Sequence, residues 1–478
     1  MCIRDRVRLS CFCLAVLALA APAWGAALDA SLDPVLAPLT NKGVVVSAQV
    51  VRLANEDVLY TRNADQLLVP ASVAKLLPTA AALALLGPDY RLLTQVLASP
   101  EALQEGCFRG PLYLRGGGDP FLDLAGLDTL VEALRQQGLL RIEGALLADA
   151  SLFRGSPVAP DWDAADLDKP YAAPASALNL CANVVNIVVS PTRAGQPPAL
   201  SLEPDPGHLA VDNQALTSSR SQSVRLTRVN QEDRFVLTGR VKRRTAFLVP
   251  LRNPALFAIA VFKHRLQSKG VEVVARVSVG PAPKEAVPLA SLQSAPLAEI
   301  VARTNKESIN YAAEVLLRLC GLPLGGPDSA QDGLRTVHQF AVLTGAWPLS
   351  LADGSGLSRS SKVSTRALTR LLAYAYDQPW GSAFCDSLPI AGEDGTLAPR
   401  MRNSCARGRV LAKTGTLKGV SALAGYVRGD NGPALAFALL LNNGRSTLES
   451  QAVADLFAAA LCPIAASPAP APATASLG

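Results

Sequence analysis

The chain has 478 residues, which exceeds one ordinary domain, and 49% of them are hydrophobic, enough for more than one core. Its formal net charge of +6 is mild for this length, and no cluster of Lys and Arg with interleaved aromatic residues occurs, which argues against binding to nucleic acid. Neither the three histidines nor the nine cysteines have the spacing of a zinc site, so metal chemistry and a Ser-His-Asp mechanism are disfavoured.

Residues 1–26 have the pattern of a secretory signal peptide. Three arginines in the first eight residues precede the apolar stretch Leu9–Ala21, and small residues follow around Ala23. We expect cleavage between Ala23 and Ala27, and therefore export of the mature chain. No other stretch is long and apolar enough to span a bilayer, so no transmembrane anchor is expected.

The first chemical motif, Ser72-Val-Ala-Lys75, stands at the start of a predicted helix. The Ala- and Leu-rich run Val73–Leu86 ends at Gly87-Pro88, a typical helix stop. On a helix, the side chains of Ser72 and Lys75 share one face with their Cβ atoms about 5 to 6 Å apart. The amine of Lys75 can therefore reach the hydroxyl of Ser72.

Lys75 can act as a base near neutral pH only if its pKa falls from about 10.4 to near 7. Burial next to a second cation is the ordinary way to lower it. Pro78 also predicts a bend in this helix between Ala74 and Pro78. For this motif alone, the alternative is a surface helix whose Ser and Lys face water.

The long stretch that follows has the pattern of small mixed domains. Its first part reads strand, helix, strand at Leu112–Leu114, Leu127–Gln137 and Leu140–Leu147. A later part reads two strands, a helix and a strand at Val224–Val229, Phe235–Val241, Pro254–Ser268 and Val271–Val279. We therefore expect two small subdomains here.

The second motif, Ser308-Ile-Asn310, is flanked on both sides by apolar positions with helical spacing. Ser308 and Asn310 are expected at the start of a helix. Serine is also a favoured N-cap residue, so simple capping is the alternative for this motif alone.

The third motif, Lys413-Thr-Gly415, lies in a predicted strand beside a hairpin. Two apolar runs, Ser421–Val427 and Ala434–Leu441, follow it and are separated by a Gly-Asp-Asn-Gly turn. A strand edge with Lys, Thr and Gly suits an extended peptide laid alongside it, and Lys413 is the candidate second cation for Lys75. Chance strand composition is the alternative for this motif alone.

Together and in this order, S-x-x-K, S-x-N and K-T-G are typical of penicillin-binding proteins and class A β-lactamases. Ser308 lies 236 positions after Ser72, and Lys413 a further 105 positions on, which leaves room for an insertion that class A β-lactamases lack. Over Leu28–Cys462 the chain resembles the class C low-molecular-mass penicillin-binding proteins, which are D-alanyl-D-alanine carboxypeptidases/endopeptidases of the penicillin-binding protein 4 type. Further strings that carry the resemblance are Gly87-Pro-Asp-Tyr90, Leu114-Arg-Gly-Gly-Gly-Asp-Pro120, Asp149-Ala-Ser-Leu-Phe153, Asp353-Gly-Ser-Gly-Leu-Ser-Arg359 and Leu388-Pro-Ile-Ala-Gly392.

This resemblance implies an α/β (α+β) fold. A β-lactamase/transpeptidase-like domain is expected from residues 28–93 and 290–462, interrupted at residues 94–289 by one or two small α/β subdomains. The Pro/Ala-rich tail, residues 463–478, is low in complexity and is expected to be disordered.

The resemblance also implies roles for individual residues. Ser72 would be the nucleophile and Lys75 its base, while Ser308 relays a proton to the leaving amine with help from Lys413. Asn310 would orient Lys75 and hold the peptide amide. The family has Asp where this chain has Ile309, but that middle position is not expected to touch substrate.

The resemblance places further residues in substrate binding. The terminal carboxylate of the substrate would meet Lys413, Thr414, Gly415 and Thr416, and the charged end of the stem peptide's diamino acid would meet Arg359 and Asp166. For Asp166, a merely solvated carboxylate in the acidic loop Asp161–Asp168 is the alternative.

The function implied is that of a periplasmic hydrolase without a cofactor that acts on peptidoglycan stem peptides and is acylated by β-lactams. A β-lactamase or esterase on the same scaffold, and a non-catalytic wall-binding module, are the alternatives. The balance between carboxypeptidase and endopeptidase activity and the oligomeric state are left open.

Six cysteines remain after removal of the signal peptide, and an oxidising compartment permits disulfides among them. Of the 15 possible pairing schemes, Cys385 with Cys405 is the first guess.

Overall fold

The computed structural model describes residues 24–99, 103–104, 106–207, 209–230 and 232–466. Most of the predicted signal peptide, up to residue 23, and the tail from Ser467 lie outside these residues. The disorder predicted from Pro463 is wrong for its first residues, because Cys462–Ala465 form a short helix, α11, with Pro463 in its first turn. A first-turn proline fits because its missing N–H has no helical partner there.

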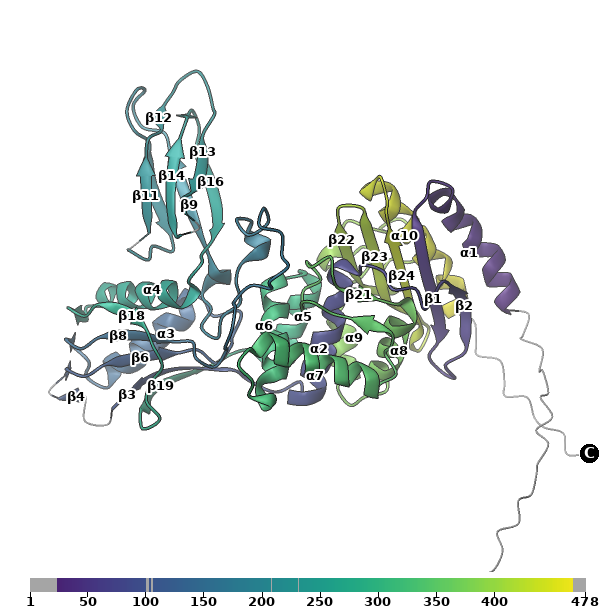
Figure 1. Ribbon diagram of the computed structural model, residues 1–478, viewed down its shortest axis with the longest axis horizontal. Helices are drawn as coiled ribbons and strands as arrows, with labels where there is room; N and C mark the ends of the chain where they lie inside the picture. Colours follow the sequence, from purple (N-terminus) through teal and green to yellow (C-terminus); the bar gives the residue numbers. More distant parts are fainter. Residues whose placement is uncertain (1–23, 100–102, 105, 208, 231, 467–478) are drawn as a thin grey trace, which may run out of the picture.

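A five-stranded antiparallel sheet, in the order β2-β1-β24-β23-β22, forms the centre of one half of the molecule (Figure 1). Its strands are β1 (Val45–Arg52), β2 (Val58–Arg62), β22 (Val410–Leu417), β23 (Val420–Gly429) and β24 (Gly432–Asn442). The strand and hairpin predicted around the third motif are thereby confirmed.

Helices cover both faces of this sheet, because its central strands are apolar on both sides. Along β24, Ala436, Ala438 and Leu440 pack into one core, while Leu435, Phe437 and Leu439 pack into another. The first core contains α2 (Leu76–Leu86), α5 (Leu297–Lys306), α6 (Asn310–Gly321), α7 (Ser329–Leu343), α8 (Thr365–Tyr376) and α9 (Gly381–Asp386). The second core contains α1 (Trp24–Thr40), α10 (Thr447–Ala460) and α11.

The chain between β2 and α5 contributes α2 to the first half and then builds the other half of the molecule (Figure 1). Its first subdomain is α/β, with a sheet in the order β18-β8-β6-β3-β19 and two helices packed on it. The elements are β3 (Leu93–Ala98), β6 (Leu112–Arg115), α3 (Leu124–Gln136), β8 (Leu146–Asp149), α4 (Pro254–Ser268), β18 (Val277–Val279) and β19 (Val287–Gln293). A small sheet beside it contains β4 (Leu103–Gln104), β5 (Cys107–Phe108), β7 (Arg141–Ile142) and β17 (Glu272–Val273).

The second subdomain is made of short strands. They are β9 (Val184–Ser190), β10 (Ala199–Glu203), β11 (Ala210–Asn213), β12 (Leu216–Thr217), β13 (Arg225–Arg228), β14 (Arg234–Thr238), β15 (Arg240–Val241) and β16 (Thr245–Pro250). Both helices predicted within the insertion are found, as α3 and α4 of the first subdomain. The predicted strands are also found, but three of them are each divided into two: Leu140–Leu147 into β7 and β8, Phe235–Val241 into β14 and β15, and Val271–Val279 into β17 and β18. Strands β3 and β19, through which the chain leaves the first half and returns, pair with each other in antiparallel fashion.

One helical stretch in the described part of the chain, Thr447–Ala465, is long and apolar enough to pass a composition test for a membrane span. This differs from the expectation that no stretch beyond the signal peptide is long and apolar enough to span a bilayer. The buried side chains Val453 and Phe457 pack against the central sheet, which accounts for the apolar character of this stretch as that of a core helix.

The predicted Cys385–Cys405 disulfide is wrong, because the two cysteines lie on opposite sides of the central sheet. Cys385 is buried in the core on one face of the central sheet. Cys405 is exposed and contacts the end of α10, which covers the other face.

Candidate active site

Ser72 and Lys75 lie on a 3-10 helix, Ala71–Lys75, that runs directly into α2. The predicted helix is therefore confirmed, but its first turn is tighter than an α-helix, and residues three apart are almost eclipsed there. Pro78 falls in the first turn of α2, where its missing N–H costs nothing, so the change of helix type at Lys75 replaces the predicted bend.

The amine of Lys75 is completely buried and has three acceptors. Its Nζ donates to Ser72 Oγ at 2.8 Å and to Asn310 Oδ1 at 2.6 Å. The third acceptor is the carbonyl oxygen of Ser355, also at 2.6 Å. This arrangement fixes the amine against the hydroxyl that it would deprotonate.

Burial lowers the pKa of Lys75 to about 7, while the carboxylates of Asp353 and Glu314 oppose this shift. The pKa that the chemistry requires is thus reached by burial, as predicted, while the predicted second cation is not among the causes of the shift. The charge of Lys75 does affect Lys413. The pKa of Lys413 is held well below its ordinary value by burial and then by the charge of Lys75.

Ser308 lies between α5 and α6 and is not a helix cap. Its φ of 59° is in the left-handed region, and Ile309 occupies the N-cap position of α6. The Ser308 hydroxyl instead accepts a hydrogen bond from Lys413 Nζ at 2.8 Å, and the same amine donates to the carbonyl of Thr414 at 3.0 Å. A strained non-glycine residue that is held by a buried lysine is typical of a functional position.

Gly415 allows the nucleophile's turn to approach β22 closely. A Cβ on Gly415 would lie 2.6 Å from the carbonyl oxygen of Pro70, at the start of the 3-10 helix. Gly356 lets a second segment approach the same turn, since a Cβ on Gly356 would lie 1.9 Å from the carbonyl oxygen of Ala71. Neither contact tolerates a side chain, so Gly415 brings the third motif, and Gly356 the segment Asp353–Arg359, against the turn that carries Ser72.

Two buried carboxylates that the sequence analysis missed support the Lys75 site. Glu314 accepts from the N–H groups of Gly354 and Ser355 at 2.8 and 2.9 Å, and it pairs with Arg318 at 3.1 Å. Asp353 accepts from the hydroxyl of Ser355 at 2.8 Å. They fix the loop whose Ser355 carbonyl holds Lys75. Helical spacing was the available signal for Glu314, which lies one turn after Asn310 on α6.

Glu314→Gln should lower the free energy of unfolding by about 3 kcal/mol, because it leaves the buried guanidinium of Arg318 without its counter-charge. Both side chains of this pair are only 1% exposed. The matched control is Glu307→Gln, which breaks the exposed i,i+4 pair of Glu307 with Arg303 and should cost at most about 0.5 kcal/mol. Denaturant unfolding measures both, and equal losses would contradict the role given to Glu314.

A cavity of about 820 Å³ opens in front of Ser72. Its lining brings together predicted residues from all parts of the chain, namely Ser72, Asp166, Asn310, Arg359 and Thr416. Lys75 lies directly behind this wall, because its amine donates to Ser72 and Asn310. Lys413 is hydrogen-bonded to Ser308 and lies close enough to Lys75 for the charge of Lys75 to lower its pKa. Thr414 is not among the described residues that line the cavity, and its hydroxyl shares a hydrogen bond of 2.8 Å with that of Thr396.

One end of the cavity carries charged groups. Asp166 accepts a hydrogen bond from the Tyr171 hydroxyl at 2.6 Å, which raises the pKa of Tyr171 to about 12. Arg359 donates to the carbonyl of Lys418 at 2.7 Å. Asp161 and Asp163 also line this end, so the acidic loop does face the cavity, which the sequence analysis left open.

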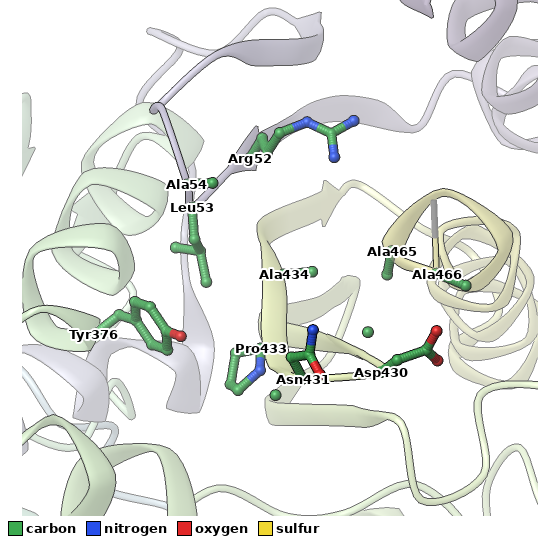
Figure 2. Close-up of a pocket in the computed structure, with 12 residues that line it drawn as sticks. Arg52, Leu53, Ala54, Tyr376, Asp430, Asn431, Pro433, Ala434, Ala465 and Ala466 are labelled. Atoms are coloured by element: carbon green, nitrogen blue, oxygen red, sulfur yellow. The ribbon is translucent and has the colours of Figure 1, made fainter. Parts of the chain in front are cut away.

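A second cavity, of about 400 Å³, lies at the β23–β24 hairpin and α11, the opposite end of the central sheet (Figure 2). Arg52, Tyr376, Asp430 and Pro433 line it, and no residue of the three motifs does. In the part of the chain that the structure describes, no three His, Cys, Asp or Glu side chains gather in a way that could hold a metal ion.

The chain is similar to known proteins over nearly its whole length. The model of the D-Ala-D-Ala carboxypeptidase 3 (S13) family matches residues 28–461. The D-alanyl-D-alanine carboxypeptidase of Actinomadura sp. (strain R39) is 35% identical over 464 residues, which cover 93% of this chain and 86% of that protein. The D-alanyl-D-alanine carboxypeptidase DacB of Haemophilus influenzae is 27% identical and covers 81% of this chain and 84% of that protein.

Solved structures share the fold. The crystal structure of penicillin binding protein 4 from Haemophilus influenzae superposes with a TM-score of 0.78 at 25% identity, over 91% of this chain and 99% of that one. A predatory peptidoglycan endopeptidase from Bdellovibrio bacteriovorus superposes with a TM-score of 0.51 at 16% identity, over 89% of this chain and 94% of that one.

Proposed function

Since the chain belongs to the D-Ala-D-Ala carboxypeptidase 3 (S13) family, it is a serine-type D-Ala-D-Ala carboxypeptidase, and we propose that it cleaves peptidoglycan stem peptides through an acyl-enzyme on Ser72. The observation that carries this proposal is the hydrogen bond from the buried Lys75 amine to Ser72 Oγ at the base of the cavity. The proposal includes a periplasmic location and acylation by β-lactams, and it leaves open whether cross-linked peptides are also cut.

In the acylation step, Ser72 Oγ attacks the carbonyl carbon of the penultimate D-alanine, and neutral Lys75 takes the hydroxyl proton. A pKa of about 7 leaves a large fraction of the amine neutral at physiological pH. Asn310 Oδ1 holds the amine, while its NH2 group, which now donates to the carbonyl of Tyr171 at 2.8 Å, lies where a substrate amide can replace that contact.

The leaving D-alanine needs a proton on its nitrogen. The Ser308 hydroxyl, hydrogen-bonded to Lys413, supplies it and is reprotonated through that amine. Lys413, Thr414, Gly415 and Thr416 form the edge of β22 that receives the terminal carboxylate. The N–H groups of Ser72 and Thr416 form the oxyanion hole, and the loss of one such donor costs roughly 3 to 4 kcal/mol.

Asp166 and Arg359 at the charged end of the cavity bind the amino and carboxylate groups of the diamino acid in the stem peptide. Asp166→Asn should therefore reduce kcat/KM by roughly tenfold for a peptide with a free diamino end, and hardly at all for the same peptide with that end acetylated. Steady-state kinetics with the two peptides test this. Asp205→Asn, at an exposed carboxylate in the insertion, is the control, and an equal loss on both peptides contradicts the assignment.

Digestion of purified muropeptides separates this function from its alternatives. The carboxypeptidase releases D-alanine from pentapeptides and retains a fluorescent penicillin as a stable covalent label. Rapid turnover of the penicillin without release of D-alanine would instead identify a β-lactamase, and the absence of both reactions would identify a wall-binding module.

A further inference from the structure

Two thiols come together where the C-terminal helices meet the segment that leads into β22. Cys405 is exposed in this segment, and its Sγ lies 3.3 Å from the carbonyl oxygen of Ala459. Cys462 is buried at the start of α11, with its Sγ 3.8 Å from the carbonyl oxygen of Ala458. The two sulfur atoms therefore sit at successive carbonyls of the last turn of α10. Burial, followed by the neighbouring thiol of Cys405, raises the pKa of Cys462 to about 12.

The other cysteines of the mature chain have different neighbours. The Cys320 thiol lies in the core and points to the carbonyl of Pro78, and the Cys385 thiol contacts Tyr426. A disulfide requires two Cβ atoms only about 4 Å apart. Two sulfur atoms that contact successive carbonyls of one helical turn can reach this separation without a large backbone movement.

We propose that Cys405 and Cys462 form a disulfide that fastens the C-terminal helices to the start of β22. The oxidant is a protein or small-molecule disulfide of the extracytoplasmic compartment, a location that rests on the proposed function. The exposed Cys405 thiolate attacks one sulfur of the oxidant and releases the first thiol. Cys462 then attacks the mixed disulfide at Cys405 and releases the second thiol, so that two protein thiols lose two hydrogens and the oxidant gains them.

The position of this bond gives it a structural effect. Cys462 follows Cys405 by 57 residues, and the loop so closed contains β22, β23 and β24, with the whole third motif. The ion pair of Arg400 with Asp455, at 2.6 Å and largely buried, already ties the same two segments together. The covalent bond therefore reinforces the docking of α10 on the sheet that carries Lys413.

The test uses the full mature chain, incubated with oxidised glutathione and then alkylated before peptide mapping. We expect one cross-linked peptide that joins Cys405 to Cys462, and a melting temperature about 5 °C above that of the reduced protein. Cys405→Ala should lose the cross-link, and its melting temperature should be the same with and without oxidised glutathione. Cys107→Ala, at a half-buried cysteine in the insertion, should keep the cross-link and the rise in melting temperature.

A glutathione adduct on Cys405 with Cys462 still open to alkylation, or a cross-link between other cysteines, would overturn the proposal. Labelling with fluorescent penicillin is measured on the same samples. A labelled protein without the cross-link contradicts the disulfide alone, whereas a cross-linked protein that takes no label contradicts the acyl-enzyme alone.

Discussion

Ser72→Ala is expected to abolish covalent labelling by penicillin and to reduce the release of D-alanine by roughly 10⁴-fold or more. The alanine removes the only atom that forms the acyl bond, while Lys75 keeps its hydrogen bonds to Asn310 and to the Ser355 carbonyl. The site should therefore stay folded and bind substrate without reacting. Gel fluorescence after incubation with a fluorescent penicillin, together with product analysis of pentapeptide digests, measures both effects.

The control is Ser360→Ala, at an exposed serine near the cavity that has no part in the proposed chemistry. It should label like the wild type. Retained labelling of Ser72→Ala, with an unchanged melting temperature, would remove Ser72 from its role and leave the cluster of three motifs unexplained.

Lys75→Met is expected to slow acylation by about 10³-fold or more, because it removes the base and leaves the Ser72 hydroxyl with no proton acceptor. Methionine has nearly the length of lysine and suits a buried site, so the loss should be chemical and not a loss of fold. Stopped-flow or quenched-flow labelling with penicillin gives the rate constant of acylation, and circular dichroism checks the fold.

Lys169→Met, at an exposed lysine directly after the acidic loop, is the matched control and should acylate at the wild-type rate. If Lys75→Met and the wild type were acylated equally fast, another group would have to take the proton from Ser72.

The sequence predicted the site better than it predicted the surroundings of the site. The spacing of Ser72 and Lys75 follows from local helix geometry, and the strand of Lys413 follows from the two apolar runs and the turn beyond it, so both could be read from the chain. The 3-10 form of the first turn could not be predicted from the sequence. It depends on how closely Gly415 and Gly356 let the segment Ala71–Lys75 approach other parts of the chain. Such contacts join residues hundreds of positions apart.

The sequence also did not show which interaction lowers the pKa of Lys75. The prediction combined burial with a second cation, yet burial is the cause that lowers this pKa, and the carboxylates of Asp353 and Glu314 oppose it. Burial is a property of the assembled core. The disulfide guess failed for the same reason, since the sequence does not tell that Cys385 and Cys405 belong to opposite faces of one sheet.

The pH dependence of the acylation rate tests most directly whether a neutral Lys75 activates Ser72. Protonation of the amine below its pKa of about 7 removes the base, so the rate constant for penicillin should be half-maximal near pH 7, should fall about tenfold per pH unit below that and should be level above pH 8. A rate constant that stays level down to pH 5, or one that reaches half its maximum only near pH 10, would contradict the account.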